Sequence, residues 1–368
     1  IRGGMDKPGL LGLGDEIKGV TFVPLEVTTD DASLIDGVYD YAVTDRYIYV
    51  LPVKEPRIVL FDRQGRFIRT LVKEGQGPGE FRGILPCIQV DERNDRLFLF
   101  SNNRVWEYTL EGEFIGQSTH EYSVIYMRHI GKDRFAAISF PFQPFNGGGF
   151  GLGLFSRKGD TIAIKNDFYS FLLPHEKSGF TTSIAPAYSD AQNSVLFKTG
   201  SNDTVFCISA GRISAACVLD LKNSDAEVIR SLDVTDMSNL RIEKKDPKDI
   251  FVQDMIEFPG HYYFRLLYNQ GYYIASVDKK TGKTLVEKCV MPGSIYELAD
   301  ANLQHGMQGT RSYRNFPVWG RVIKDELVQV VTPYELNLYK SLRSITIPQE
   351  LDLKGEEGNP VFVFYSLI

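Results

Sequence analysis

The stretch RIVLFDRQGRFIRTL, Arg57 to Leu71, consists of an apolar strand pattern, a short polar turn and a second strand pattern. The same arrangement returns in RVWEYTLEGEFIGQS, Arg104 to Ser118, and in GLGLFSRKGDTIAIK, Gly151 to Lys165. Each turn ends in a glycine, and these glycines follow one another at intervals of 47 residues: Gly65, Gly112 and Gly159. Two equal intervals indicate an internal repeat, and a strand-rich repeat of this length is typical of a propeller blade.

Weaker copies of the repeat follow downstream. TVFCISAGRISAACV surrounds Gly211 and YIASVDKKTGKTLVE surrounds Gly282, at intervals that lengthen to 52 and 71 residues. Longer segments must therefore be inserted between the later copies. Two further strand patterns stand before each hairpin, such as VYDYAVTD and RYIYVLPV before the first one. The pattern predicts four short strands per repeat, joined as an antiparallel meander.

This repeat predicts six blades, which cover residues 38–72, 84–118, 124–165, 183–221, 250–289 and 316–366. The last blade supplies only three strand patterns of its own. EIKGVTFVPLEVTT, Glu16 to Thr29, is a strand pattern without a blade, and pairing residues 19–28 with the C-terminal strand closes the ring and covers both sheet edges. We therefore predict an all-β, six-bladed β-propeller of four-stranded antiparallel blades over residues 17–368, with residues 1–16 as a flexible tether.

The composition limits which classes of partner and cofactor the chain is expected to bind. The formal net charge is −6 and no basic stripe is present, which argues against nucleic acid as a partner. The four cysteines form no CxxC pair and the five histidines no HExxH motif, so we expect neither a metal nor another cofactor. No apolar run reaches the ~18 residues of a membrane span. The chain begins at Ile1 in a glycine-rich stretch, which a removed signal peptide or a trimmed chain would explain.

The segment GQGPGEF joins the outermost strand pattern of the first blade to the innermost one of the second. The chain must turn sharply there, so we expect the glycines to allow positive φ and close backbone approach, and the proline to stiffen the loop. The glutamate is expected to accept backbone N–H groups and the phenylalanine to pack between blades. A phosphate-binding loop needs a helix to follow, and a strand pattern follows instead. The residues with this structural role are Gly75, Gly77, Pro78, Gly79, Glu80 and Phe81.

The order FDRQGRFI, GQGPGEF and RLFLF resembles that of the NHL-repeat propellers. The whole chain is more similar to a family of six-bladed β-propeller proteins from gut Bacteroidetes, which are exported or lipid-anchored. The matching pieces are IKGVTFVPLE at the start, GQGPGEF between the first two blades and GNPVFVFYSLI at the end. The resemblance implies export to the cell envelope, as a periplasmic protein or as an outer-membrane lipoprotein tethered through an N-terminal lipid anchor. It implies no activity, and no catalytic motif carries over.

Strand alternation assigns the connections to two faces. The turns between the first and second strands, and between the third and fourth strands, are short and share one face, called here the tight-turn face. Nearly every long segment falls on the opposite, loop-bearing face, and long loops are often functional. Three of these segments combine aromatic, basic and amide groups, which suit sugars, peptides or anions. Packing of the loops onto the ring is the alternative role for the residues Phe145, Asn146, Tyr169, His175, His305, Arg311, Tyr313 and Arg314.

The innermost strands carry a mixed set of polar residues that we expect to line the central channel: Asp40, Gln89, Arg128, His129, Asp254 and Arg321. Two arginines in this set would repel a cation. We therefore predict an exported, monomeric, non-catalytic propeller that binds a glycan, a peptide or a partner protein on the loop-bearing face over the channel. The alternative is a metal-dependent lyase or hydrolase with its site in the channel, which would need three or more convergent carboxylate or histidine ligands.

Overall fold

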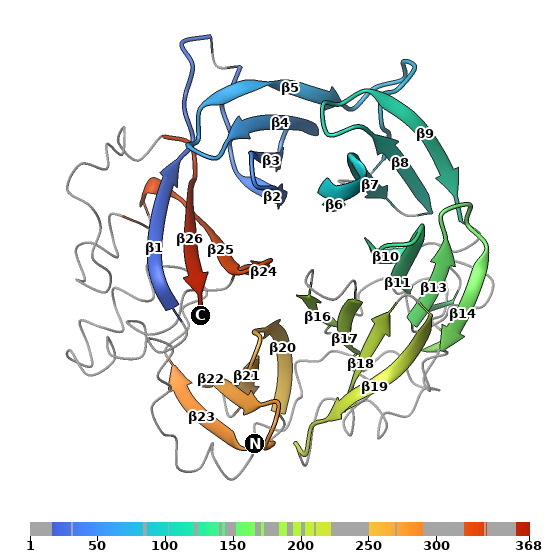
Figure 1. The fold of residues 1–368 in the computed structure, drawn as a ribbon, viewed down its shortest axis with the longest axis vertical. Helices are drawn as coiled ribbons and strands as arrows, with labels where there is room; N and C mark the ends of the chain where they lie inside the picture. Colours follow the sequence, from blue (N-terminus) through green and yellow to red (C-terminus); the bar gives the residue numbers. More distant parts are fainter. Residues whose placement is uncertain are drawn as a thin grey trace.

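Six four-stranded antiparallel sheets stand around a central axis, and the predicted all-β, six-bladed propeller is confirmed (Figure 1). The computed structural model describes residues 17–368 except 31, 84–86, 102, 121–123, 140–141, 144–151, 166–170, 173–183, 190–193, 200–202, 210, 222–249, 269–270, 290–319, 335 and 337–357. The expected tether, residues 1–16, lies outside the described residues.

The first three blades each run from an inner to an outer strand. Blade 1 consists of β2 (Val38–Val43), β3 (Tyr47–Pro52), β4 (Arg57–Asp62) and β5 (Phe67–Lys73). Blade 2 consists of β6 (Cys87–Asp91), β7 (Arg96–Ser101), β8 (Arg104–Tyr108) and β9 (Phe114–Thr119), with the short 3-10 helix η2 (Glu92–Asn94) after β6. Blade 3 consists of β10 (Val124–His129), β11 (Arg134–Ser139), β13 (Leu152–Ser156) and β14 (Thr161–Lys165).

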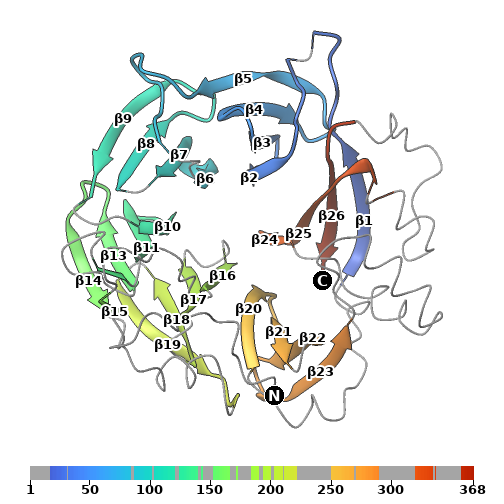
Figure 2. The same cartoon turned by 180° about the vertical axis from the view of Figure 1, so that it is seen from behind.

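The other three blades complete the ring (Figure 2). Blade 4 consists of β16 (Ile184–Ser189), β17 (Ser194–Thr199), β18 (Thr204–Ser209) and β19 (Arg212–Val218). Blade 5 consists of β20 (Ile250–Glu257), β21 (His261–Tyr268), β22 (Gly271–Asp278) and β23 (Thr284–Cys289). Blade 6 consists of β24 (Arg321–Ile323), β25 (Glu326–Val331), β26 (Val361–Leu367) and β1 (Ile17–Pro24).

The two ends of the chain meet in blade 6. Strand β1 pairs antiparallel with β26, so that Val20 lies opposite Tyr365 and Phe22 opposite Val363. The strand order β1-β26-β25-β24 places the N-terminal strand at the outer edge of the sheet that the C-terminal strand shares. The predicted closure of the ring is therefore confirmed. It joins the N-terminal and C-terminal strands of the chain through backbone hydrogen bonds within one sheet, rather than through a contact between neighbouring sheets.

The hydrophobic core lies between the blades rather than within any one sheet. On β4, Ile58 and Leu60 pack into a cluster shared with blade 2, whereas Val59 and Phe61 pack into a cluster shared with blade 6. All four side chains are fully buried. Successive strand residues point to opposite faces, and a blade is covered on both faces by its neighbours. This explains why the inner strands read as continuous apolar runs rather than as alternating ones.

The repeated turn glycines lie at the seams between blades. Gly65 and Gly159 take left-handed φ angles of 81° and 97°. A Cβ atom on Gly65 would lie 2.2 Å from the carbonyl oxygen of Pro24 in β1, and one on Gly159 would lie 2.8 Å from that of Thr119 in β9. Each turn therefore lies against the outer strand of the preceding blade. The glycine meets both a conformational and a steric requirement.

The GQGPGEF segment also packs against a neighbouring blade, but the φ angles of its glycines differ from the expectation. Only Gly79 takes a left-handed φ, of 79°, whereas Gly75 and Gly77 do not. Gly75 is constrained sterically instead, because a Cβ atom there would lie 1.8 Å from Oε2 of Glu80. The Glu80 carboxylate occupies that space because it accepts the N–H of Gly77 at 2.7 Å. Phe81 is fully buried between blades 1 and 2.

An unpartnered histidine is sealed into the contact between blades 2 and 3. His120 is 2% exposed, and its ring lies 6.2 Å from that of Phe135 and 5.6 Å from that of Phe155. Neither ring nitrogen has a hydrogen-bond partner among the described residues. Burial lowers the pKa of His120 to about 4, so the imidazole is neutral in the folded protein at neutral pH.

Acidification is expected to destabilise the protein through His120. Between its unfolded pKa of roughly 6.5 and its folded pKa of about 4, only the unfolded chain binds the proton, so stability falls as the pH drops through this range. The variant His120→Phe should be more stable than the wild type at pH 7 by about 1–2 kcal/mol, because two unsatisfied buried nitrogens are removed. Its advantage should grow by up to about 3 kcal/mol at pH 4. Urea unfolding at pH 7, 5.5 and 4 measures both effects; a constant difference across these pH values would contradict the assignment.

Candidate functional site

The innermost strands of the six blades surround the axis of the ring, and they carry the predicted channel residues (Figures 1 and 2). Asp40 lies on β2, Gln89 on β6, Arg128 and His129 on β10, and Arg321 on β24. Asp254 lies on β20, but its side chain lies outside the described residues. Asp40, Gln89, Arg128 and His129 are all buried. Their burial reflects engagement with neighbouring blades.

Asp40 joins three blades. Its Oδ2 accepts the backbone N–H of Ile88 in blade 2 at 2.7 Å, and its Oδ1 accepts that of Tyr41 at 2.9 Å. The carboxylate also pairs with the guanidinium group of Arg321 in blade 6. Arg321 in turn donates to the carbonyl oxygen of Tyr41 at 2.8 Å. Burial is the largest single influence on Arg321 and lowers its pKa, but the charge of Asp40, its hydrogen bond and the nearby phenols of Tyr41 and Tyr126 together outweigh burial, and the pKa is raised.

Gln89 links blade 2 to blade 3 through the backbone of His129. Its amide nitrogen donates to the His129 carbonyl at 2.7 Å, and its amide oxygen accepts the His129 N–H at 2.5 Å. The His129 ring stacks on Phe98, with the ring centroids 4.8 Å apart, and its Nδ1 lies 3.5 Å from Oδ2 of Asp91. Burial lowers the pKa of His129, which the charge of Asp91 opposes. The side-chain amide of Gln89 thus makes with His129 the same two hydrogen bonds that a pair of opposite residues makes in an antiparallel sheet, here between two blades.

Arg128 and Arg321 both act on the same phenol group. Burial raises the pKa of Tyr126, and the positive charges of the two arginines oppose that rise. Burial also raises the pKa of Tyr41 to about 12, which again places a neutral phenol beside a guanidinium group. This part of the channel wall combines two cations with neutral hydroxyl groups. The two phenols, Tyr41 and Tyr126, are therefore neutral at neutral pH.

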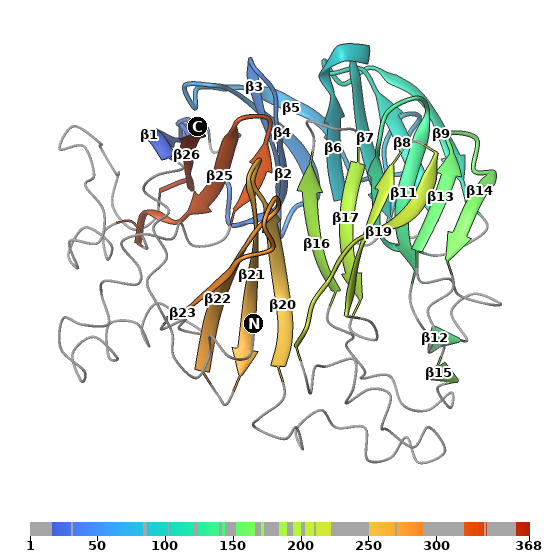
Figure 3. The same ribbon diagram turned by 60° about the horizontal axis from the view of Figure 1, so that its bottom comes forward.

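The predicted ligand-binding residues belong to the long insertions and not to the innermost strands. Phe145, Asn146, Tyr169, His175, His305, Arg311, Tyr313 and Arg314 all lie outside the described residues. Two short strands from the insertions are described, however. β12 (Phe142–Gln143) pairs in parallel with β15 (Phe171–Leu172), and in Figure 3 this pair lies beyond the ends of blade 3. The insertion within blade 3 and the link from blade 3 to blade 4 thus meet on the loop-bearing face.

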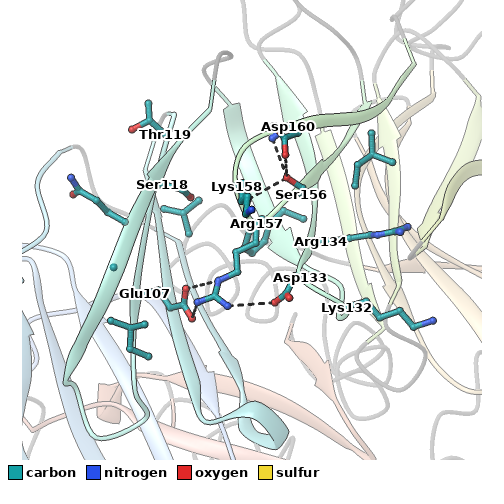
Figure 4. Close-up of a pocket in the computed structure, with 16 residues that line it drawn as sticks. Glu107, Ser118, Thr119, Lys132, Asp133, Arg134, Ser156, Arg157, Lys158 and Asp160 are labelled. Carbon is teal, nitrogen blue, oxygen red and sulfur yellow. Dashed lines mark hydrogen bonds and ion pairs between the residues drawn. The ribbon is translucent and has the colours of Figure 1, made fainter.

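A cavity of 780 Å³ opens between blades 2 and 3, a feature that the sequence pattern does not predict. One wall is formed by five consecutive residues of the outer strand β9, Ile115 to Thr119, and the other by the turns of blade 3. At its floor, Glu107 of blade 2 accepts from Arg157 of blade 3 at 2.8 and 2.5 Å (Figure 4). The same carboxylate pairs with Arg96 at 2.6 Å.

The pair at the floor of this cavity has a counterpart at another seam. Arg63 stands in the turn of blade 1 where Arg157 stands in the turn of blade 3, two residues before the repeated glycine. Its guanidinium group lies 2.8 Å from Glu326 and 4.1 Å from the ring centroid of Phe364, both in blade 6. The turns of blades 1 and 3 therefore share an arginine that reaches back to the preceding blade, whereas blade 2 has Leu110 at this position. The Glu107–Arg157 pair can be understood as structural.

Two other features bear on possible functions. Among the described residues, no group of three His, Cys, Asp or Glu side chains is placed to hold a metal ion. The described part of the chain also contains no helix that is long and apolar enough to cross a membrane. The described polar groups of the channel engage one another across blades, and the cavity between blades 2 and 3 is lined by charged, hydroxyl and aliphatic side chains together.

The six four-stranded sheets and the pairing of β1 with β26 define a six-bladed β-propeller. The chain belongs to the family described as Domain of unknown function (DUF4934), whose model matches residues 1–366. No curated protein matches the chain.

Two solved structures share the fold. A Bacteroides fragilis protein designated as a candidate exported protein is 16% identical, with 98% of each chain covered and a TM-score of 0.68. A member of the DUF4221 family from Bacteroides vulgatus is 11% identical, with 96% of this chain and 98% of that chain covered and a TM-score of 0.52.

Proposed function

We propose that this protein is an exported, non-catalytic binding propeller that holds a glycan, a peptide or a partner protein on its loop-bearing face over the channel. The observation that carries this proposal is the pairing of β12 with β15. Two insertions that enter at different points of the chain are joined there by backbone hydrogen bonds. Such pairing brings two separate insertions together on one face, and loops held by a rigid scaffold often carry binding residues.

The state of the channel residues favours binding over catalysis. Both carboxylate oxygens of Asp40 are engaged, one by Arg321 and the Tyr41 N–H, the other by the Ile88 N–H. The amide of Gln89 is engaged at both its oxygen and its nitrogen. A general base or a metal ligand needs a free lone pair directed at the substrate or ion. These side chains instead stabilise the ring that supports the loops.

The export of the chain is part of this proposal. It is supported by the fold shared with the Bacteroides fragilis protein, whose designation names export. A periplasmic or lipid-anchored state, an NHL-like character of the repeat and a monomeric state remain predictions from the sequence. They are testable by fractionation of the cell envelope and by light scattering of the purified protein.

The binding site can be located by hydrogen–deuterium exchange. The full chain is incubated with a panel of neutral and acidic oligosaccharides and of short peptides, and ligands that shift the thermal midpoint are carried forward. We expect protection in the insertions 140–151 and 166–183, which contain β12 and β15. Protection confined to the turns of the tight-turn face, or turnover of any ligand to a product, would contradict the proposal.

A further inference from the structure

The cavity between blades 2 and 3 is built along an open sheet edge. β9 is the outermost strand of its sheet, and among the described residues its one pairing partner is β8. The N–H of His120, which follows β9, donates inward to the carbonyl of Asn103 at 2.7 Å. Inward- and outward-facing residues alternate along an antiparallel edge, so the backbone groups of Gln117 and Thr119 point away from the sheet. The turn of Gly159 in blade 3 already lies against the carbonyl oxygen of Thr119, so the open part of this edge is centred on Gln117.

Gly116 makes this edge accessible. It lies opposite Glu107 in the ladder, on the strand face above the Glu107–Arg157 pair. A Cβ atom on Gly116 would meet no other atom within 4 Å, and its φ is not left-handed, so the fold itself does not require glycine here. A glycine inside a strand with open space beside it allows another backbone to approach closely.

The side chains around the cavity indicate the chemistry of an occupant. Ile115 and Ile162, on opposite walls, are 39% and 41% exposed. Lys132 and Lys158 also line the cavity, and their amines have no carboxylate partner within the described part of the chain. Among the nearby carboxylates, Glu107 binds two arginines and Asp160 accepts from Ser156 at 2.9 Å, whereas Asp133 is 73% exposed and lies 3.6 Å from Arg157. The cavity therefore offers apolar surface, free cations and an unpaired strand edge together.

We propose that this groove binds an extended acidic peptide, which adds a fifth strand to blade 2 along Ile115 to Ser118 and places carboxylates near Lys132 and Lys158. Strand addition supplies affinity through the outward N–H and carbonyl groups of Gln117. The lysines select acidic side chains, and the isoleucines take alternate apolar ones. The site is separate from the loop-bearing face proposed above, so that either proposal can fail alone.

The test uses a peptide of alternating valine and glutamate, and the valine–lysine peptide as its charge-reversed control, with the full chain in calorimetric titrations. Gly116→Val fills the open space of the groove, and Gln117→Pro removes an outward N–H without removing a ladder hydrogen bond. Each variant should weaken binding at least about tenfold, as should the double variant Lys132→Ala/Lys158→Ala. Gly19→Val is the matched control, because Gly19 also lies on an outer strand with nothing within 4 Å of an added Cβ atom.

Thermal unfolding separates a lost site from a lost fold, since all these substitutions are at exposed or open positions and should leave the midpoint within a few degrees. Exchange protection at residues 115–118 on addition of the acidic peptide completes the expected result. The proposal is overturned by equal binding of the lysine peptide, by full binding to Gly116→Val, or by an acidic oligosaccharide that protects residues 115–118 when the peptide does not.

Discussion

Asp40→Ala is expected to lower the free energy of unfolding by about 3–5 kcal/mol, the largest effect of any channel substitution. The carboxylate is buried, holds the backbone of blades 1 and 2 through two N–H groups, and neutralises Arg321 of blade 6. Its removal leaves a guanidinium group, whose side chain is only 23% exposed, without its anion. Urea unfolding of the variant and of the wild type measures the difference.

A double-mutant cycle isolates the ionic part of this effect. Arg321→Met and the double variant Asp40→Ala/Arg321→Met complete the cycle, and we expect a coupling energy of about 2–3 kcal/mol, in which the double variant is less damaged than the two single losses added together. Asp40→Asn keeps an acceptor for the Ile88 N–H and should cost less than Asp40→Ala. Additive single effects would show that Asp40 and Arg321 do not act as a pair.

Gly65→Ala is expected to cost about 2–5 kcal/mol. The left-handed φ of 81° accounts for about 1–2 kcal/mol with any residue that has a Cβ atom. The added Cβ atom would also clash with the carbonyl oxygen of Pro24. To relieve this clash, the turn of blade 1 must move away from the closing strand β1, which costs a further ~1–3 kcal/mol.

Gly282→Ala is the matched control for the steric part of this cost. Gly282 stands in the equivalent turn of blade 5 with a φ of 69°, but an added Cβ atom would meet nothing within 4 Å. This variant should therefore lose only the conformational ~1–2 kcal/mol. Equal losses in the two variants, measured by urea unfolding, would refute a role for Gly65 in holding the seam between blades 6 and 1.

The sequence predicts the ring because its signals are local and repeated. The 47-residue interval between Gly65, Gly112 and Gly159 defines the blade, and four strand patterns in each repeat give the meander. The last blade has only three strand patterns of its own, and the strand pattern near Val20 belongs to no other blade. Pairing it with the C-terminal strand near Val361 completes that blade, and the two strands do pair. The order of strands also indicates which residues stand on the innermost strands, as with Asp40 and Arg321.

The contacts between blades are decided by the tertiary structure alone. Asp40 and Arg321 are 281 positions apart in the chain, and no pattern in either segment indicates that the two charges meet. The same is true of the cavity over Glu107 and Arg157, which lies between the outer strand of blade 2, with open space beside Gly116, and the turns of blade 3.

The sequence by itself thus determined the number of blades, their four strands and the closure of the ring, since strand periodicity and turn chemistry act over a few residues. Only the tertiary structure decided what lies between the blades. Those contacts depend on the angle and distance between neighbouring sheets, which bring together side chains that no local rule relates. The turn glycines belong to both levels: their spacing reveals the repeat, and the neighbouring blade explains why alanine does not fit at Gly65.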